Sequence, residues 1–307
     1  MGNYLNLGNS GFAAALPNAA EIIDERDAPV REAAADPALQ KNGLVAFRDR
    51  DATICRQTMR SVARRIYFDR GGRKKMKKIG IIGAMAQEVE RLKGRMEARR
   101  TISKASMEFL EGTLNGTEAV IVQSGIGKVN AAICAQILCD LFAVTHIINT
   151  GVAGSLKNEI NIGDIVVSTD ALHHDMDARV VGVKLGEVPQ AGCLAFPADP
   201  HLQGLAVTCC QEIDTAHAIY QGRIVSGDQF ISDRQDKAKI IENFQGFCVE
   251  MEGASIAQAA YLNHVPFVII RAISDKADDS AEMDFPLFEK EAAARSAALV
   301  EHMLPLI

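Results

Sequence analysis

Short apolar runs alternate with amphipathic segments along the chain from Ile79 onward. The apolar runs have the length of buried strands, and the amphipathic segments have the length of helices. This alternation predicts a three-layer α/β/α fold with a central mixed β-sheet, formed by one domain over residues 76–307. Asn115-Gly116, between two of the runs, is a strong hairpin signal. The expected strands are 79–83, 107–113, 118–123, 146–149, 164–168, 221–226, 247–249 and 266–270, and the expected helices, after an amphipathic segment ending at Arg95, are 128–142, 200–214, 234–244, 252–263 and 288–303.

Residues 1–75 do not share this pattern. Alanine-rich and aspartate-rich patches alternate there without a sustained period, and a basic run follows at 73–78. The start lacks the apolar h-region of a signal peptide, and the many acidic residues are not typical of a transit peptide. We therefore expect either a disordered leader or a start assigned too far upstream, with translation beginning at Met76.

Composition narrows the classes of function. The net charge is −6 and the chain has no Trp, so neither a basic surface nor an aromatic platform for nucleic acid is expected. The seven cysteines form no CxxC pair and fall mostly in expected helices, which is typical of buried thiols in a reducing compartment. We expect a cytoplasmic protein without a metal site, because His173-His174 has no partner at zinc-ligand spacing. No apolar run reaches the roughly 18 residues that span a bilayer.

Acidic residues follow the ends of several apolar runs. Glu88, Glu252 and Asp275 each come a few residues after an expected strand. In open α/β sheets, ligands collect outside the carboxyl ends of the strands. Carboxylates from separate strands at that edge favour proton-transfer chemistry over passive binding. The alternatives are that Asp275 is a loop or capping acid and that Glu252 stabilises a helix N-terminus.

Neighbouring residues suggest what the acids would bind. In an extended segment, Glu250 and Glu252 would share a face, and a carboxylate suits a ribose diol because it accepts two hydroxyl hydrogen bonds. Met251 between them would pack against a sugar or base, or simply in the core. Phe230, between an expected strand and helix, is either a stacking wall for a flat heterocycle or core filler. Arg271 would orient or neutralise an acid, or be a surface charge.

Glycines follow two of the expected strands. Gly125-Ile126-Gly127-Lys128 resembles a phosphate cradle only weakly, because the Gly-Lys-Ser/Thr part of a P-loop is missing, and a tight strand-to-helix turn is favoured. Gly151-Val152-Ala153-Gly154 is favoured as ligand-facing, since its glycines would let a ligand approach the backbone closely.

Seven short motifs stand in order at 78–88, 124–129, 147–151, 163–168, 226–231, 249–252 and 271–275. In order and spacing they resemble the bacterial 5'-methylthioadenosine/S-adenosylhomocysteine nucleosidases, of the purine nucleoside phosphorylase-like superfamily. The resemblance covers about three quarters of the chain, excludes the leader, and implies a nucleoside phosphorylase-like fold. It implies hydrolysis of an N-glycosidic bond, giving adenine and a 5-thioribose derivative, without a cofactor or metal.

The resemblance also implies roles for individual residues. Glu88 would activate water, and Asp275 would protonate the purine at N7. Glu252 would bind the ribose hydroxyls, and Phe230 would stack on the adenine. The backbone of Ile231 would bind the base, and Ser274 would support the acid. Met251 and Phe285 would line the sugar and the 5'-substituent.

A partner subunit often closes the 5' pocket in this family, so a homodimer is expected. Pro189 matches the lip through which it does so. The same lip departs from the family at Ala178, Val181 and Val183, where larger apolar residues are common, which leaves the preferred 5'-substituent open. Val152 stands where some relatives carry Ser.

The nucleophile could be water or phosphate. Related phosphorylases are expected to hold phosphate with arginines. The matching places in this chain, 86–88 and 150–152, carry no arginine. Glu88 would repel a phosphate dianion, so hydrolysis is favoured. The alternatives are a hydrolase for 6-amino-6-deoxyfutalosine or 5'-deoxyadenosine and a non-catalytic nucleoside-binding protein of the same fold.

Overall fold

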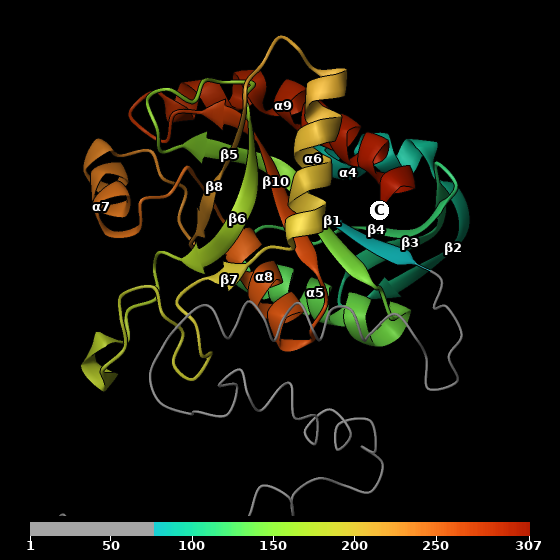
Figure 1. Cartoon of the computed structure of the whole chain (residues 1–307), viewed down its shortest axis with the longest axis horizontal. Helices are drawn as coiled ribbons and strands as arrows, with labels where there is room; N and C mark the ends of the chain where they lie inside the picture. The colour runs from blue at the N-terminus through green and yellow to red at the C-terminus, as the bar shows by residue number, and fades with distance from the viewer. Residues whose placement is uncertain (1–76) are drawn as a thin grey trace, which may run out of the picture. The chain divides into compact units, whose positions relative to one another are not determined.

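A ten-stranded mixed sheet forms the centre of the fold (Figure 1). The computed structural model describes residues 77–307, and the predictions made for residues 1–75 and for a start at Met76 lie outside this range. The elements are β1 (Lys78–Gly83), α4 (Ala86–Arg95), β2 (Glu97–Lys104), β3 (Met107–Leu114), β4 (Thr117–Gln123), α5 (Lys128–Phe142), β5 (His146–Ser155), β6 (Ile165–His173), a 3-10 helix (Arg179–Val181), β7 (Phe196–Pro197), α6 (Pro200–Ile213), β8 (Ile219–Ser226), α7 (Arg234–Phe244), β9 (Cys248–Glu250), α8 (Gly253–Leu262), β10 (Phe267–Asp275), α9 (Ala281–Met303) and a last 3-10 helix (Leu304–Leu306).

Part of the sheet closes on itself. The strand order is β10-β6-β8-β9-β5-β1-β4-β3-β2, and β10 pairs with β5 as well as with β6. Strands β10, β6, β8, β9 and β5 therefore form a ring, from which the other strands extend. β5 runs parallel to both β1 and β10, so the carboxyl ends of these strands lie at one edge. This edge is where the sequence predicts a ligand site.

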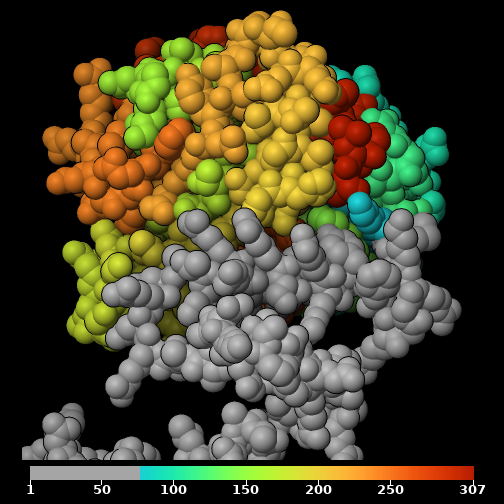
Figure 2. All heavy atoms as spheres, in the orientation of Figure 1, coloured from blue at the N-terminus to red at the C-terminus, as the bar shows by residue number. Residues whose placement is uncertain are grey.

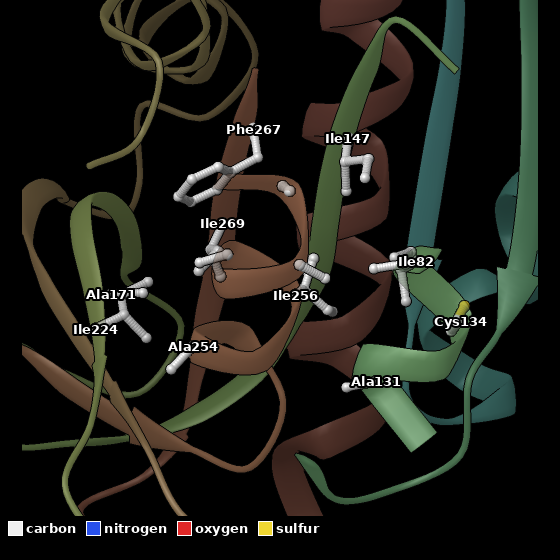
Figure 3. Close-up of a cluster of buried hydrophobic side chains, with 14 of the residues drawn as sticks. Ile82, Ala131, Cys134, Ile147, Ala171, Ile224, Ala254, Ile256, Phe267 and Ile269 are labelled. Atoms are coloured by element: carbon white, nitrogen blue, oxygen red, sulfur yellow. The ribbon is translucent and has the colours of Figure 1, made fainter. Parts of the chain in front are cut away.

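Helices cover both faces of the sheet, and each face has its own apolar cluster. Ile79 and Ile81 of β1 belong to the cluster under α4, α6 and α9, whereas Ile82 belongs to the cluster under α5 and α8. Figure 3 shows the second cluster, with Ile82, Cys134 and Ile256 reaching from strand and helices into one layer. On the face seen in Figure 2, α6 lies beside the end of α9. The three-layer prediction is confirmed.

Several predicted elements match the structure closely. Helices 128–142 and 234–244 begin and end where the sequence places them. The hairpin between β3 and β4 turns at Asn115 and Gly116, which both have positive φ, as a type I′ turn requires. Of the four cysteines expected to be buried in helices, Cys134, Cys209 and Cys210 are buried, whereas Cys139 is only partly buried.

Other predicted boundaries are wrong. The last helix begins at Ala281 instead of residue 288, because the chain continues its helix through Pro286. Strand β2 was not predicted, because it is exposed at nearly every position and shows no apolar alternation. The Gly151–Gly154 segment does not follow a strand but lies inside β5, which is longer than the predicted run.

Helix length and hydropathy bear on the membrane prediction. Across residues 77–307, every helix is too short or too polar to cross a bilayer.

Gly112 in β3 lies against the backbone of β2, and its replacement tests how closely the two strands approach. A Cβ there would stand 2.2 Å from the carbonyl oxygen of Glu97 and 2.9 Å from Cα of Ala98, and backbone atoms cannot move aside cheaply. Gly112→Ala should therefore lower the free energy of unfolding by about 1–3 kcal/mol, measured by urea denaturation. Gly94→Ala is the control, because a Cβ in that helix position meets nothing within 4 Å. Equal stability of the two variants would contradict the close approach.

Candidate active site

Glu88 lies in the first turn of α4, so it is not delivered directly by a strand end. Its Oε2 accepts hydrogen bonds from the backbone N–H groups of Ala84 (2.6 Å) and Met85 (2.9 Å), as the acid of a capping box does. Its Oε1 accepts the N–H of Val152 in β5 (3.0 Å). Burial raises the pKa of Glu88, although the charge of Arg271 opposes the shift. A raised pKa suits a carboxylate that takes up a proton near neutral pH.

Asp275 is the last residue of β10 and is buried. Its Oδ2 accepts the hydroxyl of Ser274 (2.9 Å), and its Oδ1 accepts the N–H of Ala277 (2.8 Å). Burial raises the pKa of Asp275 against the effect of these hydrogen bonds. The bond to Ala277 is the local loop contact that the alternative interpretation expected. A carboxyl group that stays protonated through burial can also act as an acid.

Arg271 is neither a charge on the surface nor a partner in an ion pair between helices. It lies midway along β10 with only 2% of its surface exposed. Its guanidinium donates hydrogen bonds to a carboxylate oxygen of Glu250 and to Oδ1 of Asn149. The hydroxyl of Ser226 donates to the other carboxylate oxygen of Glu250. Although burial opposes it, Arg271 lowers the pKa of Glu250, so the structure pairs a buried cation with a buried anion.

The acids Glu250 and Glu252 have different surroundings although one residue separates them. Oε2 of Glu250 accepts the N–H groups of Glu252 (3.1 Å) and Gly253 (2.7 Å), at the start of α8. Glu252 makes no capping hydrogen bond, and its Oε1 accepts the N–H of Gly127 (2.8 Å) instead. The acid that serves the helix N-terminus is thus Glu250. Burial, together with the charge of Glu250, raises the pKa of Glu252 to about 8.

Glycines in β5 let the acids approach its backbone. A Cβ at Gly151 would stand 2.4 Å from Oε1 of Glu88, and a Cβ at Gly154 would stand 2.7 Å from Oδ1 of Asp275. β9 also pairs with β5 at Gly154, and Glu252 follows two residues after the end of β9. The charges of Glu88 and Glu252 also interact. Acids that are far apart in the sequence therefore border one stretch of β5.

The apolar candidates differ in exposure and in contacts. Phe230, after β8, is 48% exposed, so it is not core filler. Its ring meets that of Phe285 from α9 edge-on, with centroids 5.5 Å apart. These two rings give an aromatic surface suited to a flat heterocycle. The other apolar candidates differ in burial: Val152, Ala153 and Ile231 are buried, and Met251 is partly buried.

Pro189 is the candidate from the predicted lip. It lies between the first 3-10 helix and β7, and its neighbours Val188 and Ala191 pack against the core. In residues 77–307 no hydrogen bond, ion pair or ring contact connects it to the acids. Its predicted role concerns a second copy of the chain and stays a prediction.

A cavity of about 190 Å³ lies between residues 229–231 and α7, and Ile231, a predicted base contact, is part of its wall. His174, Asp175, Gln229 and Lys239 supply polar groups to its wall, whereas Glu88, Glu252 and Asp275 do not line it. The candidate active site is therefore the acidic cluster along β5, not this cavity.

A possible metal-binding group also lies outside the cluster. In the described part of the chain, Cys209, Glu212 and His302 bring ligand atoms within 4.8 Å of one another. They belong to α6 and α9, which carry none of the acids of the site.

Sequence reasoning missed several supporting residues. The sequence did not indicate the bonds of Asn149 and Ser226 to the Arg271–Glu250 pair. Their signal was present, since each is a polar residue within or at the end of an apolar run. The Gly127 N–H that holds Glu252 is a backbone group and leaves no trace in the sequence.

Comparison with known proteins now identifies the family. The sequence model of the phosphorylase superfamily matches residues 78–305. A 5'-methylthioadenosine/S-adenosylhomocysteine nucleosidase of Chromohalobacter salexigens is 43% identical over 230 residues, which are 75% of this chain and 97% of that protein. The chain therefore belongs to the phosphorylase superfamily and, within it, to the 5'-methylthioadenosine/S-adenosylhomocysteine nucleosidase family, as the motifs indicated.

Solved structures agree with this assignment. The nucleosidase of Neisseria meningitidis in complex with methylthio-immucillin-A is 40% identical, with a TM-score of 0.73 over 76% of this chain and 100% of that one. A futalosine hydrolase of Helicobacter pylori is 30% identical, with a TM-score of 0.72 over 76% and 99%. The nucleoside phosphorylase-like fold is confirmed.

The raised pKa of Glu252 should make stability depend on pH. Glu252 keeps its proton up to about pH 8 in the folded state but loses it near its usual pKa of 4.5 when the chain is unfolded. The folded state then binds more protons between these values, so stability falls as pH rises through this window. Glu252→Gln should remove part of this fall in the free energy of unfolding, on the order of a few kcal/mol by pH 8.

Urea denaturation between pH 5 and pH 8 measures this effect. The control is Glu90→Gln, at an exposed position of α4, which should keep the wild-type dependence. A Glu252→Gln profile parallel to that of the wild type would contradict the raised pKa.

Proposed function

We propose that the protein hydrolyses the N-glycosidic bond of 5'-methylthioadenosine and S-adenosylhomocysteine, releasing adenine and a 5-thioribose derivative. The observation that carries this proposal is the gathering of Glu88, Glu252 and Asp275 along β5. The family membership supports the choice of substrates. We place the nucleosidase in a single domain over residues 76–307, in the cytoplasm.

Asp275 is proposed to make the base a better leaving group. Breaking the C1'–N9 bond leaves negative charge on the purine and positive charge on the sugar. A proton from Asp275 to N7 neutralises the purine as it leaves, and a raised pKa keeps that proton available. Ser274 orients the carboxyl group by its hydrogen bond. The reaction needs no cofactor, because each proton comes from a side chain or from water.

Glu88 is proposed to take a proton from the water that attacks C1'. The attacking oxygen forms the new C1'–O bond, and its proton passes to the carboxylate of Glu88. Glu252 would hold the ribose hydroxyls by hydrogen bonds to its carboxyl oxygens. Three backbone N–H groups fix Glu88 so that it needs little reorganisation.

The electrostatics favour water over phosphate as the nucleophile. A phosphate dianion would need free cationic groups, but the guanidinium of Arg271 is already paired with Glu250. Glu88 and Glu252 add further negative charge when ionised. A neutral nucleophile enters such a site at a lower electrostatic cost than a dianion.

Phe230, Phe285 and Met251 are proposed to bind the purine and the apolar 5'-substituent, with Ile231, Val152, Ala153 and Gly154 beside them. The edge-on pair of phenylalanine rings supports this role. The likeness to a futalosine hydrolase, at 30% identity, keeps 6-amino-6-deoxyfutalosine and 5'-deoxyadenosine as the second candidate substrates.

We also propose that two copies of the chain form a homodimer in which Pro189 of each copy closes the other's 5' pocket. Val129 and Ile133 expose apolar side chains four residues apart in α5, which places them on one face of the helix, and Ile126 just before the helix is exposed as well. Val180 in the lip is 96% exposed. Exposed apolar surface of this extent is typical of an interaction site.

Variants of the two proton-transfer residues test the proposed mechanism. Glu88→Gln and Asp275→Asn keep the shape of the side chains but cannot exchange the proton. Each should lower the turnover number about 10²–10⁴-fold while nucleoside binding persists, measured by adenine release and by calorimetry. Unchanged turnover in both variants would overturn the assignments.

The substrate is tested by adenine release from a panel of 5'-substituted adenosines in phosphate-free buffer. The proposed function predicts turnover of 5'-methylthioadenosine and S-adenosylhomocysteine without phosphate. Strict dependence on phosphate would make the protein a phosphorylase. Turnover of 6-amino-6-deoxyfutalosine alone would favour the second candidate, and binding without turnover of any member would show a non-catalytic protein.

Light scattering tests the homodimer. The wild-type chain should be a dimer at micromolar concentration, and Val129→Glu should shift it towards monomer by placing a charge on the apolar face. Glu242→Lys, a charge change on the exposed side of α7, is the control. A monomeric wild-type chain would overturn the proposal.

A further inference from the structure

Charged side chains join three segments that lie far apart in the sequence. Lys128 begins α5, Asp175 follows β6, and Asp228 follows β8. Nζ of Lys128 donates to both carboxylate oxygens of Asp175, at 2.6 and 2.7 Å. Oδ2 of Asp175 also accepts the backbone N–H of Asp228 (3.0 Å). We call Lys128, Asp175 and Asp228 the loop clamp.

Asp228 closes the loop clamp at the N-terminus of α5. Its Oδ1 accepts the backbone N–H of Lys128 (2.8 Å), across 100 residues of sequence. The first turn of α5 has no acidic residue of its own, and its N-cap residue is Gly127, which has no side chain to cap the helix. A helix N-terminus favours a negative charge. Asp228, which is distant in the sequence, therefore provides the acidic cap that the first turn of α5 lacks.

The turn that Asp228 holds carries the hydrogen-bond donor of Glu252. The N–H of Gly127 donates to Oε1 of Glu252 (2.8 Å), one residue before the N–H that Asp228 accepts. Gly127 has a φ of 97°, a left-handed conformation that fixes the direction of its N–H. A Cβ on Gly127 would stand 3.2 Å from Oδ1 of Asp228, so the two residues are in close contact.

The other end of the loop clamp is part of the segment proposed to hold the base. Asp228 stands two residues before Phe230 and three before Ile231. The same side chain is thus attached to the turn that holds the sugar-binding carboxylate and belongs to the segment that holds the purine. Asp175 adds a second attachment through the backbone of Asp228.

We infer that Asp228 is a positioning residue that aligns the carboxylate of Glu252 with the purine-binding segment of Phe230 and Ile231. This inference rests on the proposed function, because alignment matters only where one ligand spans both groups. Asp228 acts through Gly127 and makes no contact with the reacting atoms. Its loss would leave the 125–128 turn joined to the 227–231 segment only through the Lys128 side chain and Asp175. This looser link would let the two segments shift, and a shift of about 1 Å between groups that bind one substrate can cost about 10²-fold in rate.

Kinetics of five variants test the inference. Asp228→Ala should lower kcat/KM for 5'-methylthioadenosine about 10²-fold. Asp228→Asn keeps an oxygen that accepts the N–H of Lys128, so it should retain activity within about threefold of the wild type. In a cycle with Glu252→Gln, the Asp228→Ala change should have little further effect, because the group it positions is gone. If the losses in kcat/KM of the two variants simply multiply in the double variant, Asp228 does not act through Glu252.

Asp199→Ala is the matched control for the loss of a helix cap. Asp199 accepts two N–H groups at the start of α6, outside the site. The Asp199→Ala variant should lower the melting temperature, as Asp228→Ala does, but leave kcat/KM unchanged. Equal kinetic losses in the two variants would make Asp228 merely structural. A wild-type chain that releases no adenine would refute the proposed function, whereas an active wild type with unaffected Asp228→Ala would refute the inference alone.

Discussion

The buried ion pair between Arg271 and Glu250 is the interaction on which the site depends. A guanidinium that is 2% exposed would be very costly without a partner. Glu250 supplies the opposite charge, while Asn149 and Ser226 satisfy further polar groups of the pair. Because Arg271 belongs to β10, Asn149 to β5 and Ser226 to β8, the ion pair also links strands of the closed ring. Removing either charged partner would leave the other buried and uncompensated.

The ion pair also separates the tasks of neighbouring acids. Glu250 lies against the guanidinium, which lowers its pKa and favours its ionised form. Burial and the charge of Glu250 raise the pKa of Glu252 to about 8, although the charge of Arg271 opposes this shift. The one acid therefore holds the scaffold and the start of α8, and the other remains for a ligand. Different surroundings give identical side chains different chemistry, as in other enzymes with paired carboxylates.

The sequence predicted the order of strands and helices better than their ends. Apolar periodicity located α5 and α7 to the residue, because both are bounded by clear changes in pattern. It ended β10 at Ile270, because Arg271 is charged, and only tertiary pairing shows that the strand continues through a buried arginine. It also missed β2, which pairs along the exposed edge of β3 without burying a face. In each case long-range contacts overrode the local pattern.

The candidate site was predictable in its residue types but not in its connections. The acids stood out because each follows a buried run, and the family motifs supplied their expected roles. The bonds that hold them come from backbone N–H groups of Ala84, Val152 and Gly127, which side-chain patterns do not encode. The raised pKa of Glu252 depends on the placement of Glu250, which only the folded chain determines.

These electrostatics connect the fold to the chemistry of the site. Burial raises the pKa values of Glu88 and Asp275, so these acids hold protons more strongly than they would in water. The buried cation Arg271 is paired with Glu250, and its charge opposes the shift at Glu88 without reversing it. A site that retains protons can give one to a departing base and take one from water, but it has no free positive charge for an anionic nucleophile. The burial that makes the acids hard to ionise is therefore what suits them to hydrolysis. The closed ring of strands maintains that burial, because β10 and β9 both pair with β5 beside the acids.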